Sequence, residues 1–158
     1  MESQMKGRVS YRPMLTEDLD RVMRNERTGY SFPWAESHMD SCLRGKDHCW
    51  VIELDSNIVG HGVSSLILDE GHILNICIAH AWQSQGLGGG LLTFMLEDLT
   101  RQGAHSVFLE VRESNLAARH LYENHGFKQI GLRKGYYPSG RIREDAIVMQ
   151  RLPTIETM

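Results

Sequence analysis

Residues 81–92 read AWQSQGLGGGLL, in which four glycines stand immediately before a leucine-rich stretch. The apolar segment that precedes them, HILNICIAH at 72–80, is typical of a strand. After the glycines, apolar residues repeat at helical spacing, at Leu92, Met95, Leu96 and Leu99. The stretch therefore predicts a strand, a glycine-rich turn and a helix. The unpaired N–H groups at the start of such a helix are a ready-made binding site for a phosphate.

Three phosphate-binding patterns compete for this turn. A P-loop requires Lys and then Ser or Thr after its last glycine, whereas Leu91 and Leu92 stand there. A dinucleotide fingerprint that starts at Gly86 would need a third glycine where the chain has Leu91. The pattern that remains is Q-x-x-G-x-G, formed by Gln83, Gly86 and Gly88. A glycine-rich turn that serves only tight helix packing stays open as the alternative, because short glycine motifs are weak evidence on their own.

Composition excludes several classes of protein. The 158 residues predict one domain, with a core that spans about residues 8–152. The net charge of −3, without a basic stripe, makes direct nucleic-acid binding unexpected. The chain has no apolar run of about 18 residues and no signal-like apolar start, so we expect a cytoplasmic protein that does not bind membranes. Three cysteines without C-x-x-C spacing favour reduced thiols.

The pattern along the chain predicts a mixed α/β domain with the element order β-α-α-β-β-β-α-β-α-β-β. Thr16 is the expected N-cap of the first helix, and the second helix is expected to begin at Pro33 and to end near Gly45. Ser114 or Asn115 is the expected cap of the last helix. A Pro-Ser-Gly turn is expected to join the last two strands. The expected strands are 9–15, 49–54, 58–68, 72–80, 106–112, 127–137 and 141–152.

Two residues in the second half of the chain are candidates for proton transfer. Glu110 ends the apolar run VFLE, where an acid is out of place, although a strand-end glutamate that faces solvent is the commoner arrangement. Tyr122 falls at helical spacing with Ala118, Leu121 and His125, which puts it on or beside a buried helix face. A core aromatic with its hydroxyl at the surface is the more usual role for such a tyrosine.

Q-x-x-G-x-G between a strand and a helix resembles the acetyl-CoA pyrophosphate loop of the GNAT superfamily of N-acetyltransferases, whose element order is also the one predicted here. The segments LEVRESNLAARHLYENHGF, GYYPSG and EDAIVM resemble, more narrowly, the RimI-type ribosomal-protein-alanine N-acetyltransferases, as do FPW at 32–34 and LNI at 74–76. The chain departs from that family at Gln83, Ser84 and Gln85, where basic residues are usual. We therefore expect backbone N–H groups to carry more of the phosphate affinity than charge does.

The resemblance implies a role for each candidate residue. Glu110 matches the proton-accepting glutamate of the family, and Tyr122 matches the general acid that protonates the coenzyme A thiolate. The residues implied to grip the acceptor peptide are Phe32, Trp34, Tyr136 and Tyr137. The residues implied to bind the co-substrate acetyl-CoA are Ile76, Cys77, Ile78, Ser84, Gln85, Gly86, Leu87, Gly88, Gly89 and Asn115.

Cysteine and histidine chemistry is not expected. Cys77 is expected to be a buried structural thiol, because no histidine near it in the sequence is poised to activate it. The eight histidines are expected at the surface. No metal site is expected, since neither H-E-x-x-H nor paired C-x-x-C spacing occurs, and the tightest cluster is DHC at 47–49.

The leading hypothesis is an N-terminal acetyltransferase. It would move the acetyl group of acetyl-CoA to the N-terminal alanine of the eighteenth small-subunit ribosomal protein by direct attack, and it would bind the N-terminal segment of that protein. An α-amino group has a pKa of about 7.7–8.0, so part of the amine is already neutral at pH 7 and, before the attack, the base needs to remove a proton only from the rest. The alternatives are an acetyltransferase for lysine, a polyamine or an aminoglycoside, a non-catalytic acetyl-CoA sensor, and an α/β domain without a coenzyme.

Overall fold

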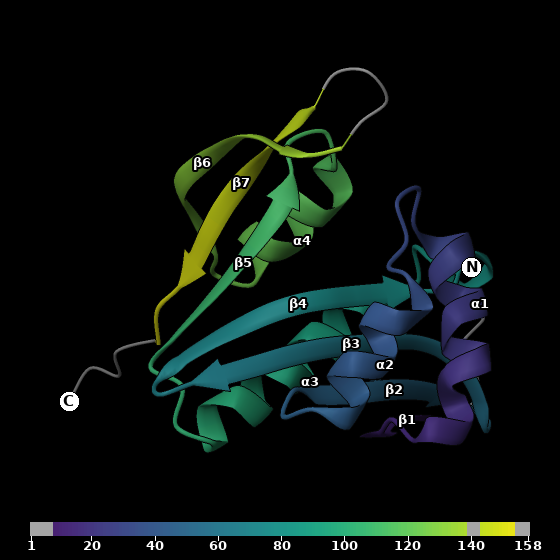
Figure 1. The fold of residues 1–158 in the computed structure, drawn as a ribbon. Coiled ribbons are helices and arrows are strands. Elements are labelled where there is room, and N and C mark those ends of the chain that lie inside the picture. The colour runs from purple at the N-terminus through teal and green to yellow at the C-terminus, as the bar shows by residue number, and fades with distance from the viewer. Residues whose placement is uncertain (1–7, 139–142, 154–158) are drawn as a thin grey trace. The chain divides into compact units, whose positions relative to one another are not determined.

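The structure, a computed structural model, describes residues 8–138 and 143–153. Seven strands form a mixed sheet in the order β1-β2-β3-β4-β5-β7-β6 (Figure 1). The pairs β1–β2, β2–β3, β5–β7 and β6–β7 are antiparallel, and β4 pairs with β5 in parallel. The strands are β1 (Val9–Pro13), β2 (His48–Leu54), β3 (Asn57–Ile67), β4 (Glu70–Ile78), β5 (Ser106–Arg112), β6 (Lys128–Tyr137) and β7 (Glu144–Arg151).

Among the described residues, four α-helices and two short 3-10 turns accompany the strands. They are η1 (Thr16–Asp18), α1 (Leu19–Gly29), α2 (Glu36–Arg44), η2 (His80–Trp82), α3 (Leu87–Arg101) and α4 (Leu116–Asn124). The order of strands and α-helices confirms the order predicted from the sequence. Among the described residues, no helix is both long enough and apolar enough to cross a bilayer.

The chain forms two compact units. The first contains the described residues up to Ser65 together with Ile73–Asp98, and the second contains Leu66–His72 together with the described residues from Leu99 onward. The glycine-rich turn and the Phe32 and Trp34 segment belong to the first unit. The second unit contains Glu110, Tyr122 and the tyrosine pair, Tyr136 and Tyr137.

The first unit has a core on both faces of its strands, because successive side chains of a strand point to opposite faces. Val51 of β2 packs toward α1 and α2, whereas its neighbour Ile52 packs with Leu87 at the start of α3. Figure 1 shows this arrangement, with α1 and α2 on one face of these strands and α3 on the other. The cluster under α1 and α2 consists of Met14, Val22, Met23, Met39, Cys42, Cys49, Val51, Ile58 and Val63.

The second unit joins α4 to three strands. Along β5 the even-numbered positions Phe108, Glu110 and Arg112 are half-buried, while the positions between them are buried. In the antiparallel register, Glu110 lies opposite Val148 of β7. Phe127, which is 2% exposed, follows α4 and meets the ring of Tyr122 edge to face.

Two predicted helix starts were wrong, for a shared physical reason. Thr16 does not cap α1, because residues 16–18 form the 3-10 turn η1 and the Asp18 carboxylate accepts the N–H of Leu15. The second helix begins at Glu36, and Ala35 is its cap without a side-chain hydrogen bond. In both places the chain makes an extra turn or extended segment first, which propensity alone does not specify.

The other boundaries agree more closely with expectation. Asn115 caps α4, with its side-chain oxygen accepting the N–H of Ala118 at 3.1 Å. Gly103, after α3, and Gly126, after α4, adopt φ of +107° and +92°, as glycines that follow a helix often do. Residues 139–142, which include most of the expected Pro-Ser-Gly turn, lie outside the described residues.

Candidate active site

The glycine-rich turn brings α3 in directly after β4 and η2. Ser84 and Gly86 adopt positive φ values of 66° and 85°, and a side chain added at Gly86 would meet nothing within 4 Å. The N–H of Gly90 donates to the carbonyl of Gly86 at 3.2 Å. The amides of residues 87–89 therefore precede the first bond of the helix, and no acidic side chain stands in that first turn. These groups form the kind of helix start that binds a phosphate.

Gln83, the first residue of the motif, has a structural task. Its side-chain Nε2 donates to the carbonyl of Ile78 at the end of β4, at 2.9 Å. This bond holds the turn against the strand before it. The exposure of Ser84 and Gly86 leaves the tip of the turn open to solvent. Gln83 thus supports the turn and does not add charge to it.

The end of β4 is the segment expected to bind the pantetheine arm. The registered pairs of β4 with β5 lie at Glu70, Gly71 and His72, so residues 76–78 fall beyond them. The carbonyl of Ile76 accepts the hydroxyl hydrogen of Tyr30. Cys77 is 3% exposed, and burial raises the pKa of its thiol, which donates to the carbonyl of Asn25 at 3.5 Å. The prediction that the Cys77 thiol is buried is confirmed.

Glu110 points its carboxylate from β5 toward Arg133 of β6. Oε2 of Glu110 lies 3.0 Å from Nε of Arg133, and the two side chains are 28% and 56% exposed. The guanidinium of Arg133 in turn lies over the ring of Tyr136, at 4.9 Å. The carboxyl group of Glu110 is therefore partly open to solvent and lies beside a guanidinium group.

Tyr122, unlike Glu110, is almost fully buried. The side chain, on α4, is 8% exposed, and burial raises its pKa to about 12, with a smaller effect from Tyr137. The phenol thus keeps its proton at neutral pH and can donate it. Burial, followed by the charge of Glu110, also raises the pKa of Tyr137 to about 12.

Arg112 contacts Tyr137 and the residue that follows it. Its guanidinium lies over the ring of Tyr137 at 4.5 Å and donates to the carbonyl of Pro138 at 2.9 Å. Glu144 pairs with Arg112 at 3.1 Å and accepts the N–H of Ser114 at 2.6 Å. These contacts tie the end of β6 to β5, β7 and the start of α4 within the second unit.

The segment between α1 and α2 carries the other two acceptor candidates. Phe32 is 48% exposed. Trp34 stacks on His38 with ring centres 3.8 Å apart, and its backbone N–H donates to a carboxylate oxygen of Glu26 at 3.0 Å. The segment is therefore anchored at Trp34 while the ring of Phe32 is half exposed.

Glu26 and His61 are the residues that the sequence analysis missed. Both are fully buried in the first unit, and His61 Nε2 lies 2.8 Å from Oε1 of Glu26. The expectation that every histidine lies at the surface was therefore wrong for His61. The signal that could have been used is position, because Glu26 follows Val22 and Met23 at helical spacing and so falls on the buried face of α1.

Glu26, His61 and Cys77 bring three possible metal-ligand atoms within 4.8 Å of one another. Two ligands of one tetrahedral zinc ion lie about 3.3 Å or more apart. The 2.8 Å contact between His61 and Glu26 is shorter than this and has hydrogen-bond length. The cluster thus fits a hydrogen-bond network better than a metal centre.

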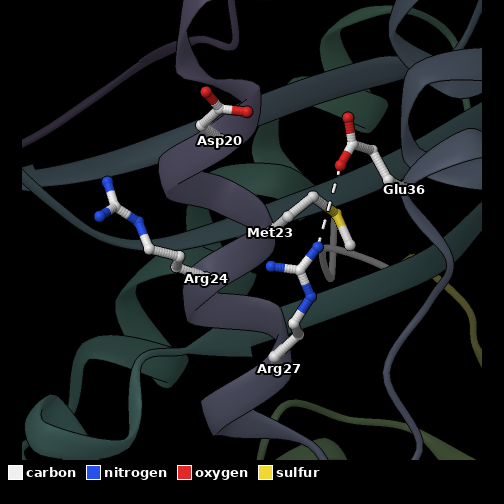
Figure 2. A pocket seen from close by; sticks show the side chains of 5 residues that line it. All are labelled: Asp20, Met23, Arg24, Arg27 and Glu36. Atoms are coloured by element: carbon white, nitrogen blue, oxygen red, sulfur yellow. Dashed lines mark ion pairs between the residues drawn. The ribbon is translucent and has the colours of Figure 1, made fainter.

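A shallow hollow of about 360 Å³ lies on the outer side of α1. Figure 2 shows its lining residues, with Arg27 of α1 and Glu36 of α2 facing each other. Their charged atoms are 3.8 Å apart and both side chains are more than half exposed, so this ion pair contributes little. It nevertheless links the two helices that flank the Phe32 and Trp34 segment.

Comparisons of the sequence and of the structure with known proteins all indicate similarity to acetyltransferases. A sequence model of the acetyltransferase (GNAT) family matches residues 15–127. The [ribosomal protein bS18]-alanine N-acetyltransferase of Escherichia coli K12 is 34% identical over 134 residues, which cover 85% of this chain and 90% of that protein. The enzyme of the same name from Haemophilus influenzae is 36% identical over 135 residues, covering 84% and 90%.

Solved structures show the same fold. The crystal structure of the ribosomal-protein-S18-alanine N-acetyltransferase from Escherichia coli superposes with a TM-score of 0.87 at 31% identity, covering 95% of this chain and 97% of that one. Ard1 from Thermoplasma volcanium shares the fold at 23% identity, with a TM-score of 0.82 and coverage of 93% and 99%. A family match over most of the chain, together with relatives above 30% identity, shows that this chain belongs to the acetyltransferase (GNAT) family.

Proposed function

We propose that this protein transfers the acetyl group of acetyl-CoA to the α-amino group of the N-terminal alanine of ribosomal protein bS18. The observation that carries the proposal is the similarity to enzymes named for that reaction, at 34% identity over 85% of the chain. The protein substrate and its ribosomal role also favour a cytoplasmic location.

Two parts of the first unit support the proposal that acetyl-CoA, which the family uses as co-substrate, binds there. The amides of residues 87–89 offer donors for the pyrophosphate, and the positive φ of Gly86 allows the backbone to turn there without a side chain. The backbone of residues 76–78, beyond the β5 pairs, offers strand-like partners for the amide groups of the pantetheine arm. The Asn115 side chain, which caps α4, is the remaining proposed contact.

The reaction needs one proton acceptor and one proton donor. The amine nitrogen attacks the thioester carbonyl carbon, so that a C–N bond forms and the C–S bond breaks. Glu110 accepts the proton lost by the amine, directly or through water, and Tyr122 gives its phenolic proton to the departing sulfur. The products are the acetylated peptide and free coenzyme A, and proton exchange with water restores both side chains.

By the family resemblance, Phe32 and Trp34 of the first unit and Tyr136 and Tyr137 of the second are proposed to contact the acceptor's first residues. Arg133 lies over the ring of Tyr136 and Arg112 over the ring of Tyr137, while the backbone N–H of Trp34 donates to Glu26. Aromatic rings offer large contact area at low cost in side-chain entropy, which suits recognition of a flexible chain end.

The direct test uses the intact acceptor. Purified protein is incubated with acetyl-CoA and unmodified bS18 that begins with alanine, and fragmentation mass spectrometry locates the acetyl group. We expect it on the N-terminal nitrogen, and we expect the double variant Glu110→Gln with Tyr122→Phe to leave bS18 unmodified. Acetyl groups found only on internal lysines, or none with the wild-type enzyme, would overturn the proposal.

A further inference from the structure

Glu26 is a charged side chain in an unusual place. It lies in the last turns of α1 with 0% exposure. Taking a carboxylate out of water costs several kcal/mol unless hydrogen bonds and a partner compensate for it. Such a group is expected to persist only where it holds other parts of the structure together.

Three segments supply the compensating donors. His61 of β3 lies 2.8 Å from Oε1, and Nδ2 of Asn75 on β4 lies 3.3 and 3.2 Å from the two oxygens. The third donor is the backbone N–H of Trp34, at 3.0 Å from Oε2. Nδ1 of His61 is buried without a partner within the described residues, so the tautomer with its hydrogen on Nε2 suits this arrangement best.

The same end of α1 is fastened to β4 by further contacts. The Tyr30 hydroxyl donates to the carbonyl of Ile76. Gly29 approaches β4 so closely that an added Cβ would lie 2.5 Å from Cys77 Sγ and 2.9 Å from the carbonyl oxygen of Ile78. Contacts this close leave the helix end little freedom to move along the strand.

We propose that Glu26 is a positioning residue that fixes the acceptor segment at Phe32 and Trp34 against the Asn75–Ile78 stretch of β4. This inference rests on the proposed function, because it takes those two segments as the acceptor and coenzyme contacts. Glu26 touches neither substrate. It acts through the N–H of Trp34 on one side and through the amide of Asn75 on the other, so the carboxylate sets where the acceptor segment sits.

A purely structural role would predict a different response. If Glu26 only stabilised the core, replacing it would lower stability and leave the acceptor KM of the folded enzyme unchanged. If it positions the segment, Glu26→Gln changes the binding of the acceptor in particular. The glutamine amide keeps the shape but turns an N–H₂ toward groups that are themselves donors, so at least one hydrogen bond to the carboxylate is lost.

The matched control is Asp18→Asn. Asp18 is also buried, lies at the other end of α1 and receives hydrogen bonds from Arg12 and from the N–H of Leu15. The same change from carboxylate to amide therefore disturbs the same helix away from the acceptor segment. A second variant, His61→Leu, removes a donor to Glu26 without altering the carboxylate and serves if Glu26→Gln does not fold.

The experiment measures steady-state constants with an alanine-initiated peptide and the hydrogen exchange of segment 30–35. We expect Glu26→Gln to raise the acceptor KM about tenfold or more, because one hydrogen bond to a charged group is lost. We expect kcat and acetyl-CoA affinity to change little, and the Trp34 amide to exchange faster than in wild type. Asp18→Asn should change neither the acceptor KM nor that exchange.

Two results would overturn the inference. One is an acceptor KM and a Trp34 exchange rate in Glu26→Gln that match those of Asp18→Asn. The other is a fall confined to kcat, which would make Glu26 part of the chemistry. If wild-type protein acetylates no alanine peptide, the proposed function fails separately, and the exchange of the Trp34 amide still decides whether Glu26 holds the segment.

Discussion

At the scale of single residues, Glu110 and Tyr122, the proposed base and acid, differ in their surroundings. Glu110 is partly open to solvent beside Arg133, whereas Tyr122 is buried, and burial raises its pKa to about 12 and keeps it protonated at neutral pH. Neither state could be read from the sequence. Glu110 stood out as an acid in an apolar strand, but its partner Arg133 is 23 residues away and meets it only across β7.

The pair of variants Glu110→Gln and Tyr122→Phe separates the two roles. Each should lower turnover by roughly 10²–10⁴-fold while acetyl-CoA still binds, the usual contribution of a general acid or base. Raising the pH toward the pKa of the amine should partly rescue Glu110→Gln, because the amine then arrives neutral. Tyr122→Phe should show no rescue. The measurement is initial rate against pH at saturating acetyl-CoA.

The pH dependence of the wild-type rate tests the direction of the Tyr122 pKa shift. Because the pKa of Tyr122 is raised, its proton is retained below pH 10 and is lost only as the pH rises toward about 12. The rate should therefore not fall between pH 8 and pH 10 through loss of the Tyr122 proton.

Near-normal turnover of Glu110→Gln at pH 7 would mean that Glu110 is only a strand residue.

At the scale of elements, the glycine-rich turn is the feature that the sequence predicted best. Its strand and helix follow from apolar periodicity. The helix begins at Leu87, however, so Gly88, Gly89 and Gly90 lie in the first turn of α3 and only Gly86 belongs to the turn before it. The bond from Gln83 to Ile78 could not be predicted, because it depends on how the turn folds back over the end of β4. Whether coenzyme binds there remains a prediction.

Gly86→Asp tests that prediction. The substitution places a negative charge where the pyrophosphate is expected and should weaken acetyl-CoA binding at least tenfold, or about 1.4 kcal/mol. Gly103→Asp is the matched control, since Gly103 also has positive φ and open space but follows the other end of α3. Titration calorimetry on both folded variants gives the affinities. Equal affinities for the two variants would move the coenzyme away from this turn.

The start of α1 offers a test of stability. Asp18 lies 2.7 Å from Arg12, and their hydrogen bond lowers the pKa of the carboxyl group in the folded state. Its stabilisation is therefore present above the unfolded pKa of about 3.9 and is lost as the pH falls through the lower folded value. We expect Asp18→Asn to lower the free energy of unfolding by about 1–2 kcal/mol at pH 7, less at pH 3.

Urea unfolding at the two pH values measures this difference. Arg12 is 32% exposed, so solvent screening keeps the expected loss at the modest end for a charged hydrogen bond. A loss that is the same at pH 3 and pH 7 would show that the Asp18 charge is not what stabilises the start of the helix.

At the scale of the whole molecule, the order of strands and helices was predictable because each element carries its own periodicity. What could not be predicted is which distant residues meet. Glu26 and His61 lie 35 positions apart, and their contact depends on the faces that α1 and β3 turn toward each other. An acidic residue on the buried face of a helix implies a hydrogen-bond partner, but which residue that is depends on the fold.

The central claim is that the enzyme acetylates an α-amino group, and it is tested most directly with two peptides. One begins with a free alanine, and the other has a blocked N-terminus and one internal lysine. Each is incubated with the protein and acetyl-CoA, and mass spectrometry follows the acetyl group. The account predicts acetylation of the free-alanine peptide alone, on its terminal nitrogen. Equal modification of the lysine peptide would contradict it.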